Sequence, residues 1–436
     1  MTRPSIEARL AAAGLAPLPR LVWLEVDLEA LAGNLRAIRT MVGDGVRVEP
    51  VVKADAYGHG AVPVALALEE AGADGFCVAA FDEAVELRRA GIRAPIVVLY
   101  PIPSEHAAHA AHAGIAVSTG GGPALHRLLD AAASAAAAPA AGPGSLAIEI
   151  EIETGLGRGG VAGGDVVEVA GTIAAAKGAR LAGLWTHLQA VEDGDRTRTQ
   201  LGRFEHALAA LAEAGLAIPR LHVAASAMIL SDSPATYDAV RPGLSIYGIP
   251  PDEMGDVAAR RATEAGLRPV LSMFARPVRV ASLPAGWGIG YGPTYVTERA
   301  GRFATLPVGY GDGWARSLSN RAQALVRGRR VPIVGNVSMD AIVADVTDVP
   351  GPAVDESDEF VLLGAQDGER ITVLDVARTR TTNTWEVVTN MAHRLPRVYH
   401  AASDVMGVRS LLTEEPSWRA SNSGTATSAI SRSTRS

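Results

Sequence analysis

A lysine at the end of an apolar run is the most informative chemical feature of this sequence. Lys53 follows the run Val46–Val52, and the small residues and glycines of 54–60 then open a turn into a helix. A lysine at the carboxyl end of a buried strand loses hydration, which lowers its pKa and makes it a usable nucleophile or proton carrier. The structural alternative is a lysine whose ammonium group reaches into water. Position alone does not favour either role.

Other apolar runs also end in residues that could carry chemistry. These residues are Glu151, Glu153, His187, His222, Ser226, Arg241, Gly243 and Leu244. Ser226 and the backbone at Gly243 suit a phosphate, because a hydroxyl and bare N–H groups bind anions. Singly, each of these residues is more often structural, but so many polar strand ends are hard to obtain by chance. A lysine facing a phosphate pocket, with an arginine nearby, is typical of a pyridoxal phosphate site.

A competing motif is the glycine pattern of dinucleotide-binding proteins. Gly155, Gly157 and Gly160 fit G-x-G-x-x-G between a strand and a helix. The acidic residue expected about twenty positions further on is missing, where the chain reads Ala174-Ala175-Ala176-Lys177. We therefore disfavour a Rossmann-type dinucleotide-binding site.

The second half of the chain contains a glycine-rich loop, 286–295, that presents Tyr291 and Tyr295. Its glycines permit close backbone approach and exposed phenols. The structural alternative is an aromatic edge on a β-hairpin, and the loop by itself does not exclude it. Residues 306–314 and 335–340 are similar loops.

The elements that must position these residues alternate regularly. The apolar runs are Val46–Val52, Gly75–Val78, Pro95–Leu99, Ile115–Val117, Leu146–Ile152, Leu181–Trp185, Leu221–Ala224 and Ala239–Ile246, and helical patterns separate them. Eight strand–helix units over about two hundred residues predict a (β/α)8 TIM-type barrel, whose active site lies at the carboxyl ends of its strands.

The pattern of apolar runs changes along the sequence and divides the chain into four segments. Residues 1–20 are expected to be a flexible leader or a short surface helix. Residues 21–255 form the predicted barrel domain, although the strand at 21–26 could pair with the second domain. Alternating runs separated by Gly, Pro and Asp turns predict a mostly β-strand C-terminal domain over 256–415. Residues 416–436 have few large apolar side chains, so we expect disorder there.

Composition narrows the class of protein. The chain has 436 residues, 48% hydrophobic and 20% charged, which suits a globular fold with a sizeable core. A net charge of −7 argues against nucleic acid or an anionic membrane as the main partner. The single cysteine, Cys77, cannot form an intramolecular disulfide. Without a secretory signal or a membrane-spanning stretch, we expect a cytoplasmic enzyme, and we assign no metal site.

At this point the motifs are recognisable as a set. Bacterial alanine racemases have a cofactor-binding motif that closely resembles Val51-Val52-Lys53-Ala54-Asp55-Ala56-Tyr57-Gly58-His59-Gly60. The resemblance continues, in order and across residues 21–400, through Glu153–Arg158, Thr186-His187, Val240–Gly243, Tyr291–Tyr295, Gly309–Gly313 and Ser338–Asp340.

The resemblance implies a site for pyridoxal 5′-phosphate. Lys53 would bind the cofactor covalently, His187 would stack on its ring, and His222 would support Arg241. Arg241 would face the pyridine nitrogen and keep it unprotonated, which shortens the life of the carbanion. The phosphate contacts implied are Tyr57, Ser226, Gly243, Leu244 and, in place of a tyrosine, Trp385.

The resemblance also implies a two-base racemisation of a small amino acid. Lys53 and Tyr291 would exchange the Cα proton from opposite faces, with Tyr291 delivered by the partner subunit of a homodimer. The residues implied around the substrate are Arg158, Met339 and Tyr310, supported by Glu151 and Asp340. D-alanine would be supplied for peptidoglycan.

Four positions depart from the family pattern: Glu151 replaces a lysine that is often carbamylated, Glu153 an aspartate, Ala225 an asparagine and Trp385 a tyrosine. A glutamate carries the charge of a carbamate and can still orient Arg158. Serine or a broader set of small amino acids stays open as substrate. A non-catalytic carrier of the cofactor would resemble the barrel alone, and a decarboxylase of related fold would not share the match at the Tyr291 loop and Arg241.

Overall fold

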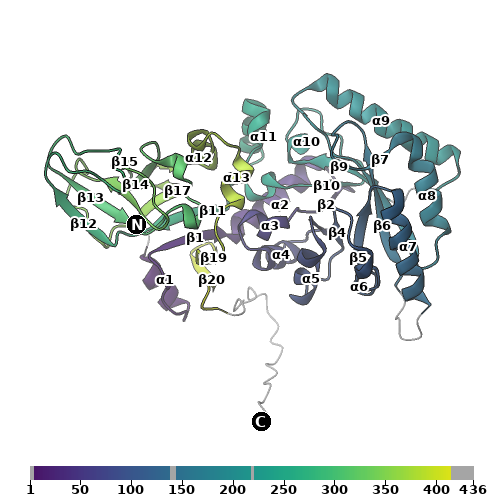
Figure 1. Ribbon diagram of the computed structural model, residues 1–436, viewed down its shortest axis with the longest axis horizontal. Coiled ribbons are helices and arrows are strands. Elements are labelled where there is room, and N and C mark those ends of the chain that lie inside the picture. Colours follow the sequence, from purple (N-terminus) through teal and green to yellow (C-terminus); the bar gives the residue numbers. More distant parts are fainter. Residues whose placement is uncertain (1–3, 138–143, 218–219, 414–436) are drawn as a thin grey trace, which may run out of the picture.

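The computed structural model describes residues 4–137, 144–217 and 220–413, so the predicted tail lies outside the described residues. Two units lie side by side (Figure 1): a barrel ringed by helices, and a mostly β unit formed largely by the later part of the chain. The fold class predicted from the sequence is confirmed.

The barrel sheet is parallel, and its strands follow the order β2-β10-β9-β8-β6-β5-β4-β3. Their bounds are β2 Arg47–Val48, β3 Phe76–Val78, β4 Ile96–Val98, β5 Ile115–Thr119, β6 Leu146–Glu153, β8 Ala179–Trp185, β9 Leu221–Ala225 and β10 Ala239–Arg241, with β7 Val161–Ala162 beside β6. Cys77 N donates to Pro50 O and Val52 N to Cys77 O, each at 2.9 Å, which links the two ends of the sheet. Each predicted run therefore holds a strand.

The eighth run differs from the prediction in its second half. Strand β10 stops at Arg241, and residues Leu244–Tyr247 form a short 3-10 helix instead. Pro242 has no N–H to continue a ladder, so the chain leaves the sheet there.

Helices surround the barrel because one face of each is apolar. In α2 the buried Leu31, Leu35 and Ile38 recur at helical spacing, and Asp27 caps the helix by accepting from Ala30 N at 2.9 Å. The other helices of this unit are α4 Ala61–Glu70, α5 Phe81–Arg89, α6 Ala107–His112, α7 Gly122–Ala136, α8 Val166–Ala175, α9 Gly194–Glu213, α10 Ser226–Ile229 and α11 Gly255–Glu264, with α2 itself at Leu28–Val42.

The second sheet contains eleven strands and includes one from the start of the chain. Strand β1, Val22–Asp27, pairs antiparallel with β11 and parallel with β19, so the N-terminal strand belongs to this sheet. The remaining strands are β11 Leu271–Ala275, β12 Arg279–Leu283, β13 Gly301–Leu306, β14 Gln323–Val326, β15 Arg329–Val334, β16 Ile342–Asp345, β17 Phe360–Gln366, β18 Glu369–Ile371, β19 Arg397–Ala401 and β20 Asp404–Arg409.

Two regions of this unit add helices. Residues Ile6–Ala12 form α1, whose Ile6 and Leu10 are buried, so this part of the predicted leader is packed. Helices α12, Val373–Arg380, and α13, Thr384–Thr389, lie between the sheet and the barrel (Figure 1). Among the described residues, no helix combines the length and the apolar composition needed to span a bilayer.

Candidate active site

The turn that follows Lys53 has an unusual backbone. In α3, Lys53–Tyr57, four consecutive non-glycine residues have positive φ: Ala54 52°, Asp55 56°, Ala56 53° and Tyr57 53°. The left-handed region costs an L-residue about 1–2 kcal/mol, so the surrounding structure must hold this turn in place.

Asp55 supplies much of that support. Its Oδ1 accepts from Ala61 N at 2.8 Å and from Arg409 Nη1 at 2.7 Å, and its Oδ2 accepts from Arg409 Nη2. Burial raises the pKa of the Asp55 carboxyl, but the hydrogen bond and charge of Arg409 outweigh burial, so the pKa falls below its usual value. Since Arg409 ends β20, this pair also ties the turn to the second unit.

The turn opens onto a cavity of about 380 Å³ at the carboxyl ends of the barrel strands. The sequence-predicted site residues that line it are Lys53, Tyr57, Arg158, His187, Ser226, Arg241, Gly243, Leu244 and Trp385. One cavity therefore brings together side chains from five strand ends and from α13.

Lys53 is the residue of this cavity whose chemistry suits a nucleophile or proton carrier. Burial lowers the pKa of its ammonium group, and the positive charge of Arg158 lowers it further. A lysine with a lowered pKa is more often neutral near pH 7, and only the neutral amine can form a covalent bond or take a proton.

One wall of the cavity is built to receive an anion. The Ser226 hydroxyl accepts from Gly243 N at 2.9 Å, Ser245 N at 3.1 Å and Ser245 Oγ at 3.0 Å, so its own proton remains available to donate. A Cβ added at Gly243 would lie 2.7 Å from Tyr57 Oη, so only glycine permits this approach. The Ser226 and Tyr57 hydroxyls are donors that fit a phosphate, and the amides of Gly243 and Ser245 hold the Ser226 hydroxyl in place.

Arg241, 2% exposed, crosses the base of the cavity. Its Nη2 donates to Thr186 O at 3.0 Å, and its Nη1 donates to His222 O at 2.9 Å and to the His222 ring nitrogen Nδ1. Trp185 lies against the guanidinium, with its ring centroid 5.0 Å from Arg241 Cζ. Within the described part of the chain Nε makes no hydrogen bond, which leaves it as a donor for a ring nitrogen.

His187 and Arg158 complete the cavity. Burial lowers the pKa of His187 to about 3, so its ring is neutral and can stack against a planar group. Arg158 lies over the Tyr100 ring at 5.6 Å, and its Nη2 lies 4.0 Å from Glu151 Oε1. Burial raises the pKa of the Glu151 carboxyl, and the charge of Arg158 opposes that rise.

Four predicted site residues, Tyr291, Tyr310, Met339 and Asp340, lie elsewhere on this chain. Among the described residues that line the cavity, Tyr291, Tyr310 and Met339 do not occur. They are exposed on the second unit, by 80%, 44% and 52% respectively. Asn336 Nδ2 fixes the Tyr291 loop by donating to Tyr291 O at 2.9 Å, while Asp340 bonds Arg394 at 2.6 Å.

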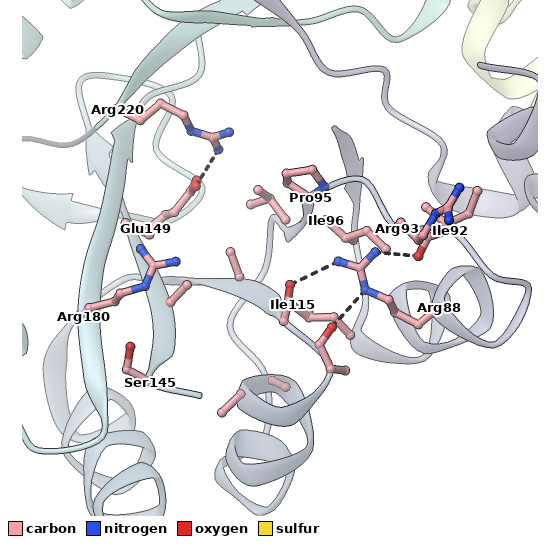
Figure 2. A pocket seen from close by; sticks show the side chains of 18 of the residues that line it. Arg88, Ile92, Arg93, Pro95, Ile96, Ile115, Ser145, Glu149, Arg180 and Arg220 are labelled. Atoms are coloured by element: carbon pink, nitrogen blue, oxygen red, sulfur yellow. Dashed lines mark hydrogen bonds and ion pairs between the residues drawn. The ribbon is translucent and has the colours of Figure 1, made fainter. Parts of the chain in front are cut away.

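A second cavity, of about 870 Å³, lies at the amino ends of the strands, and Figure 2 shows its arginines. The Arg88 guanidinium donates hydrogen bonds of 2.7–2.9 Å to the carbonyl oxygens of Ile92, Ala94 and Ala113. Arg220 is paired with Glu149 at 2.5 Å. These arginines hold the barrel together, and the lysine and the anion wall lie at the other end.

Comparison with known proteins identifies the family of the chain. The profile of "Alanine racemase, N-terminal domain" matches residues 26–251, and that of "Alanine racemase, C-terminal domain" matches residues 270–399. The alanine racemase of Symbiobacterium thermophilum is 40% identical to the chain over 383 residues, which is 87% of this chain and 97% of that relative. The chain belongs to the alanine racemase family.

Solved structures of alanine racemases share the fold. The enzyme of Bacillus anthracis with bound L-Ala-P has a TM-score of 0.82 and 32% identity, covering 91% of this chain and 99% of that one. The Bartonella henselae alanine racemase with covalently bound pyridoxal phosphate has a TM-score of 0.76 and 26% identity, covering 88% of this chain and 100% of that one.

Sequence reasoning missed part of this alanine racemase site. Asp55 lies in the lysine motif, but its position alone gave it no role, and Glu149 was not identified at all. Glu149, Glu151 and Glu153 alternate along β6, a spacing that places their side chains on one face. Glu153 accepts from Gly155 N and, at 2.9 Å, from Gly157 N, so it shapes the glycine turn.

Replacing Asp55 by alanine should destabilise the protein. The change leaves Arg409 and Ala61 N without their acceptor, and we expect a loss of about 2 kcal/mol in the free energy of unfolding, measured with urea at pH 7. Because the folded pKa of Asp55 is lowered, the difference should persist above its ordinary value of 3.8 and shrink as the pH falls through the lowered pKa.

Glu105→Ala is the control for Asp55→Ala. Glu105 is exposed and makes no hydrogen bond within the described residues, so its loss should change stability by under about 0.5 kcal/mol. Equal stability of Asp55→Ala and the wild-type protein at pH 7 would show that the carboxylate does not hold the turn.

Proposed function

We propose that this protein is a pyridoxal phosphate-dependent alanine racemase that interconverts L-alanine and D-alanine by two bases. The observation that carries the proposal is a lysine with a lowered pKa in the same cavity as an anion wall and a buried arginine. The family match over both units and the named relatives support it.

The residues of the cavity fit pyridoxal phosphate. Lys53 would hold its aldehyde carbon covalently, the Ser226 and Gly243 wall would take its phosphate, and Arg241 Nε would face its ring nitrogen. When bound, the cofactor supplies the electron sink that makes the Cα–H bond of an amino acid acidic. An arginine stays charged and keeps its proton, so the ring nitrogen would remain unprotonated.

Lys53 and Tyr291 would carry the proton on opposite faces of the substrate. The neutral Lys53 amine takes the Cα proton on one face, and the Tyr291 hydroxyl gives one on the other, or the reverse. Because Tyr291 is 80% exposed and outside the cavity of its own chain, we propose that it enters the cavity of a partner subunit in a homodimer.

Arg158 is placed to bind the carboxylate of the substrate. It lines the cavity, and the acidic Glu151 at 4.0 Å orients its guanidinium. Met339 N–H and Tyr310 would reach the same substrate from the partner, because both are exposed on the unit that carries Tyr291. The product D-alanine would serve peptidoglycan synthesis.

Alanine should be the preferred substrate. We expect the purified holoenzyme to convert L-alanine to D-alanine and D-alanine to L-alanine, both followed by chiral chromatography. The matched variant Lys53→Ala should lose this activity by at least about 10⁴-fold, because both the covalent link and one base are gone. Faster racemisation of serine than of alanine would contradict alanine as the substrate.

Mixing two inactive variants should restore activity if Tyr291 acts across the dimer. Lys53→Ala and Tyr291→Phe homodimers each lack one base in both sites. When the two variants are co-expressed with different tags, the heterodimer has one complete site, so a random mixture should show about a quarter of the wild-type rate.

The same experiment distinguishes the opposite arrangement. If Tyr291 served the Lys53 of its own chain, every site of the heterodimer would lack one base and the mixture would stay inactive. The rate of the heterodimer isolated by its two tags, measured against the two parent variants, is the deciding quantity.

A further inference from the structure

A chain of buried ionisable residues, His222, Glu149, Arg220 and Glu49, runs beneath Arg241 along the inside of the barrel. His222 Nε2 lies 2.8 Å from Glu149 Oε2, and Glu149 Oε1 accepts from Arg220 Nη2 at 2.5 Å. Arg220 Nη1 also bonds Glu49 Oε1. His222, Glu149 and Glu49 are at most 2% exposed, so the chain is shielded from water.

The two nearest polar partners of the His222 ring, Arg241 and Glu149, allow one protonation state of it. Arg220 Nη2 also lies near Nε2, but at 3.4 Å it is farther away than Glu149 Oε2 at 2.8 Å. Arg241 has donors only, so His222 Nδ1 must be the lone-pair acceptor of its Nη1. His222 Nε2 then carries the proton, and Glu149 Oε2 accepts it. The opposite tautomer, or a charged imidazolium, would set an N–H of Nδ1 against an N–H of Arg241.

The electrostatics of the pair agree with that assignment. Burial lowers the pKa of His222 to about 4, with the charges of Arg241 and Arg220 acting in the same direction. The charge and hydrogen bond of Glu149 oppose that fall without cancelling it, so the ring is neutral at pH 7. Burial raises the pKa of Glu149, but His222 and Arg220 outweigh burial and lower it, so the carboxylate is ionised. Trp185 stacks on the His222 ring at 6.0 Å and restricts its rotation.

We infer that Glu149 is a positioning residue for the racemase reaction: by accepting the Nε2 proton it fixes the tautomer of His222, which holds the Arg241 guanidinium at the base of the cofactor cavity. The effect on catalysis rests on the proposed function, whereas the tautomer itself does not. Glu149 bonds neither Lys53 nor Arg158 within the described residues, so it acts through His222.

Glutamine at position 149 cannot preserve both contacts of the carboxylate. If its amide oxygen accepts from His222 Nε2, its NH₂ group faces the Arg220 donors. If the oxygen accepts from Arg220, the NH₂ group faces His222 Nε2, and the ring must move its proton to Nδ1, against Arg241. A substitution of equal size therefore breaks the chain at one point.

The far end of this chain reaches the second cavity, where Figure 2 shows Arg220 bonded to Glu149. Glu49 is the matched control: it is a buried glutamate bonded to the same Arg220, and within the described residues it makes no hydrogen bond with His222. Glu49→Gln tests whether disturbing Arg220 is enough to produce the effect.

The tautomer is measured first, in the wild-type protein. Nitrogen-15 NMR of histidine-labelled, cofactor-free protein, with His222→Gln to assign the signal, should show the neutral Nε2–H form. A neutral Nδ1–H ring or a charged ring in the wild-type protein would overturn the inference without any variant at Glu149.

The variants then link the tautomer to catalysis. In Glu149→Gln we expect the Nε2–H signal to be lost or to appear together with the Nδ1–H signal. We expect kcat for alanine to fall by about 10–100-fold and KM to change little, because Glu149 orients a functional group without touching the substrate. In Glu49→Gln we expect the wild-type tautomer and kcat, with only lower stability.

Two results would overturn the role of Glu149. One is a Glu149→Gln protein that is less stable yet keeps the wild-type tautomer and kcat, which would make Glu149 merely structural. The other is an equal fall of kcat in Glu49→Gln. If the wild-type protein does not racemise alanine but Glu149→Gln still changes the tautomer, the proposed function fails while the fixing of His222 stands.

Discussion

The burial of Arg241 is the constraint on which the site depends. Removing a guanidinium from water costs several kcal/mol unless hydrogen bonds and opposite charge compensate it. Carbonyl oxygens of Thr186 and His222 accept from both terminal nitrogens, and the His222 ring accepts as well. Glu149 supplies a negative charge one residue further away. The cation is thereby held rigidly at the base of a cavity. Burial and the charge of Arg158 are the main causes of the lowered pKa of Lys53, and the charge of Arg241 is a smaller cause in the same direction.

A second constraint places Lys53 itself. Strand β2 and the residues after it end in a left-handed turn, and that turn is retained because groups from outside the barrel bond it. Arg409 of β20 bonds Asp55, and Arg397 of β19 donates to Gly58 O at 2.8 Å. The second unit therefore fixes the backbone beside Lys53. The turn beside Lys53 thus depends on contacts from both units, and the family match also spans both.

The sequence predicted the architecture because its periodic signals are strong. Each of the eight apolar runs between residues 46 and 246 holds a barrel strand, and the cavity contains Lys53, Ser226 and Arg241 as the strand-end pattern indicated. Interactions between distant positions could not be predicted in this way. The pairing of Asp55 with Arg409 joins residues 354 positions apart, and that of His222 with Glu149 joins residues 73 apart. Tyr291 lies outside the cavity of its own chain, and the proposed approach to a partner's Lys53 is something that periodicity within one chain does not describe.

The central claim is that two bases act from opposite faces, and the fate of the Cα proton tests it most directly. Protiated L-alanine is incubated with the holoenzyme in D₂O, and deuterium at Cα is measured in both enantiomers at low conversion. The account predicts that nearly all D-alanine carries deuterium, because the group that delivers the proton exchanges with solvent and is not the group that removed it. D-alanine that retains the original protium would mean that one base serves both faces, and the assignment of Lys53 and Tyr291 would be wrong.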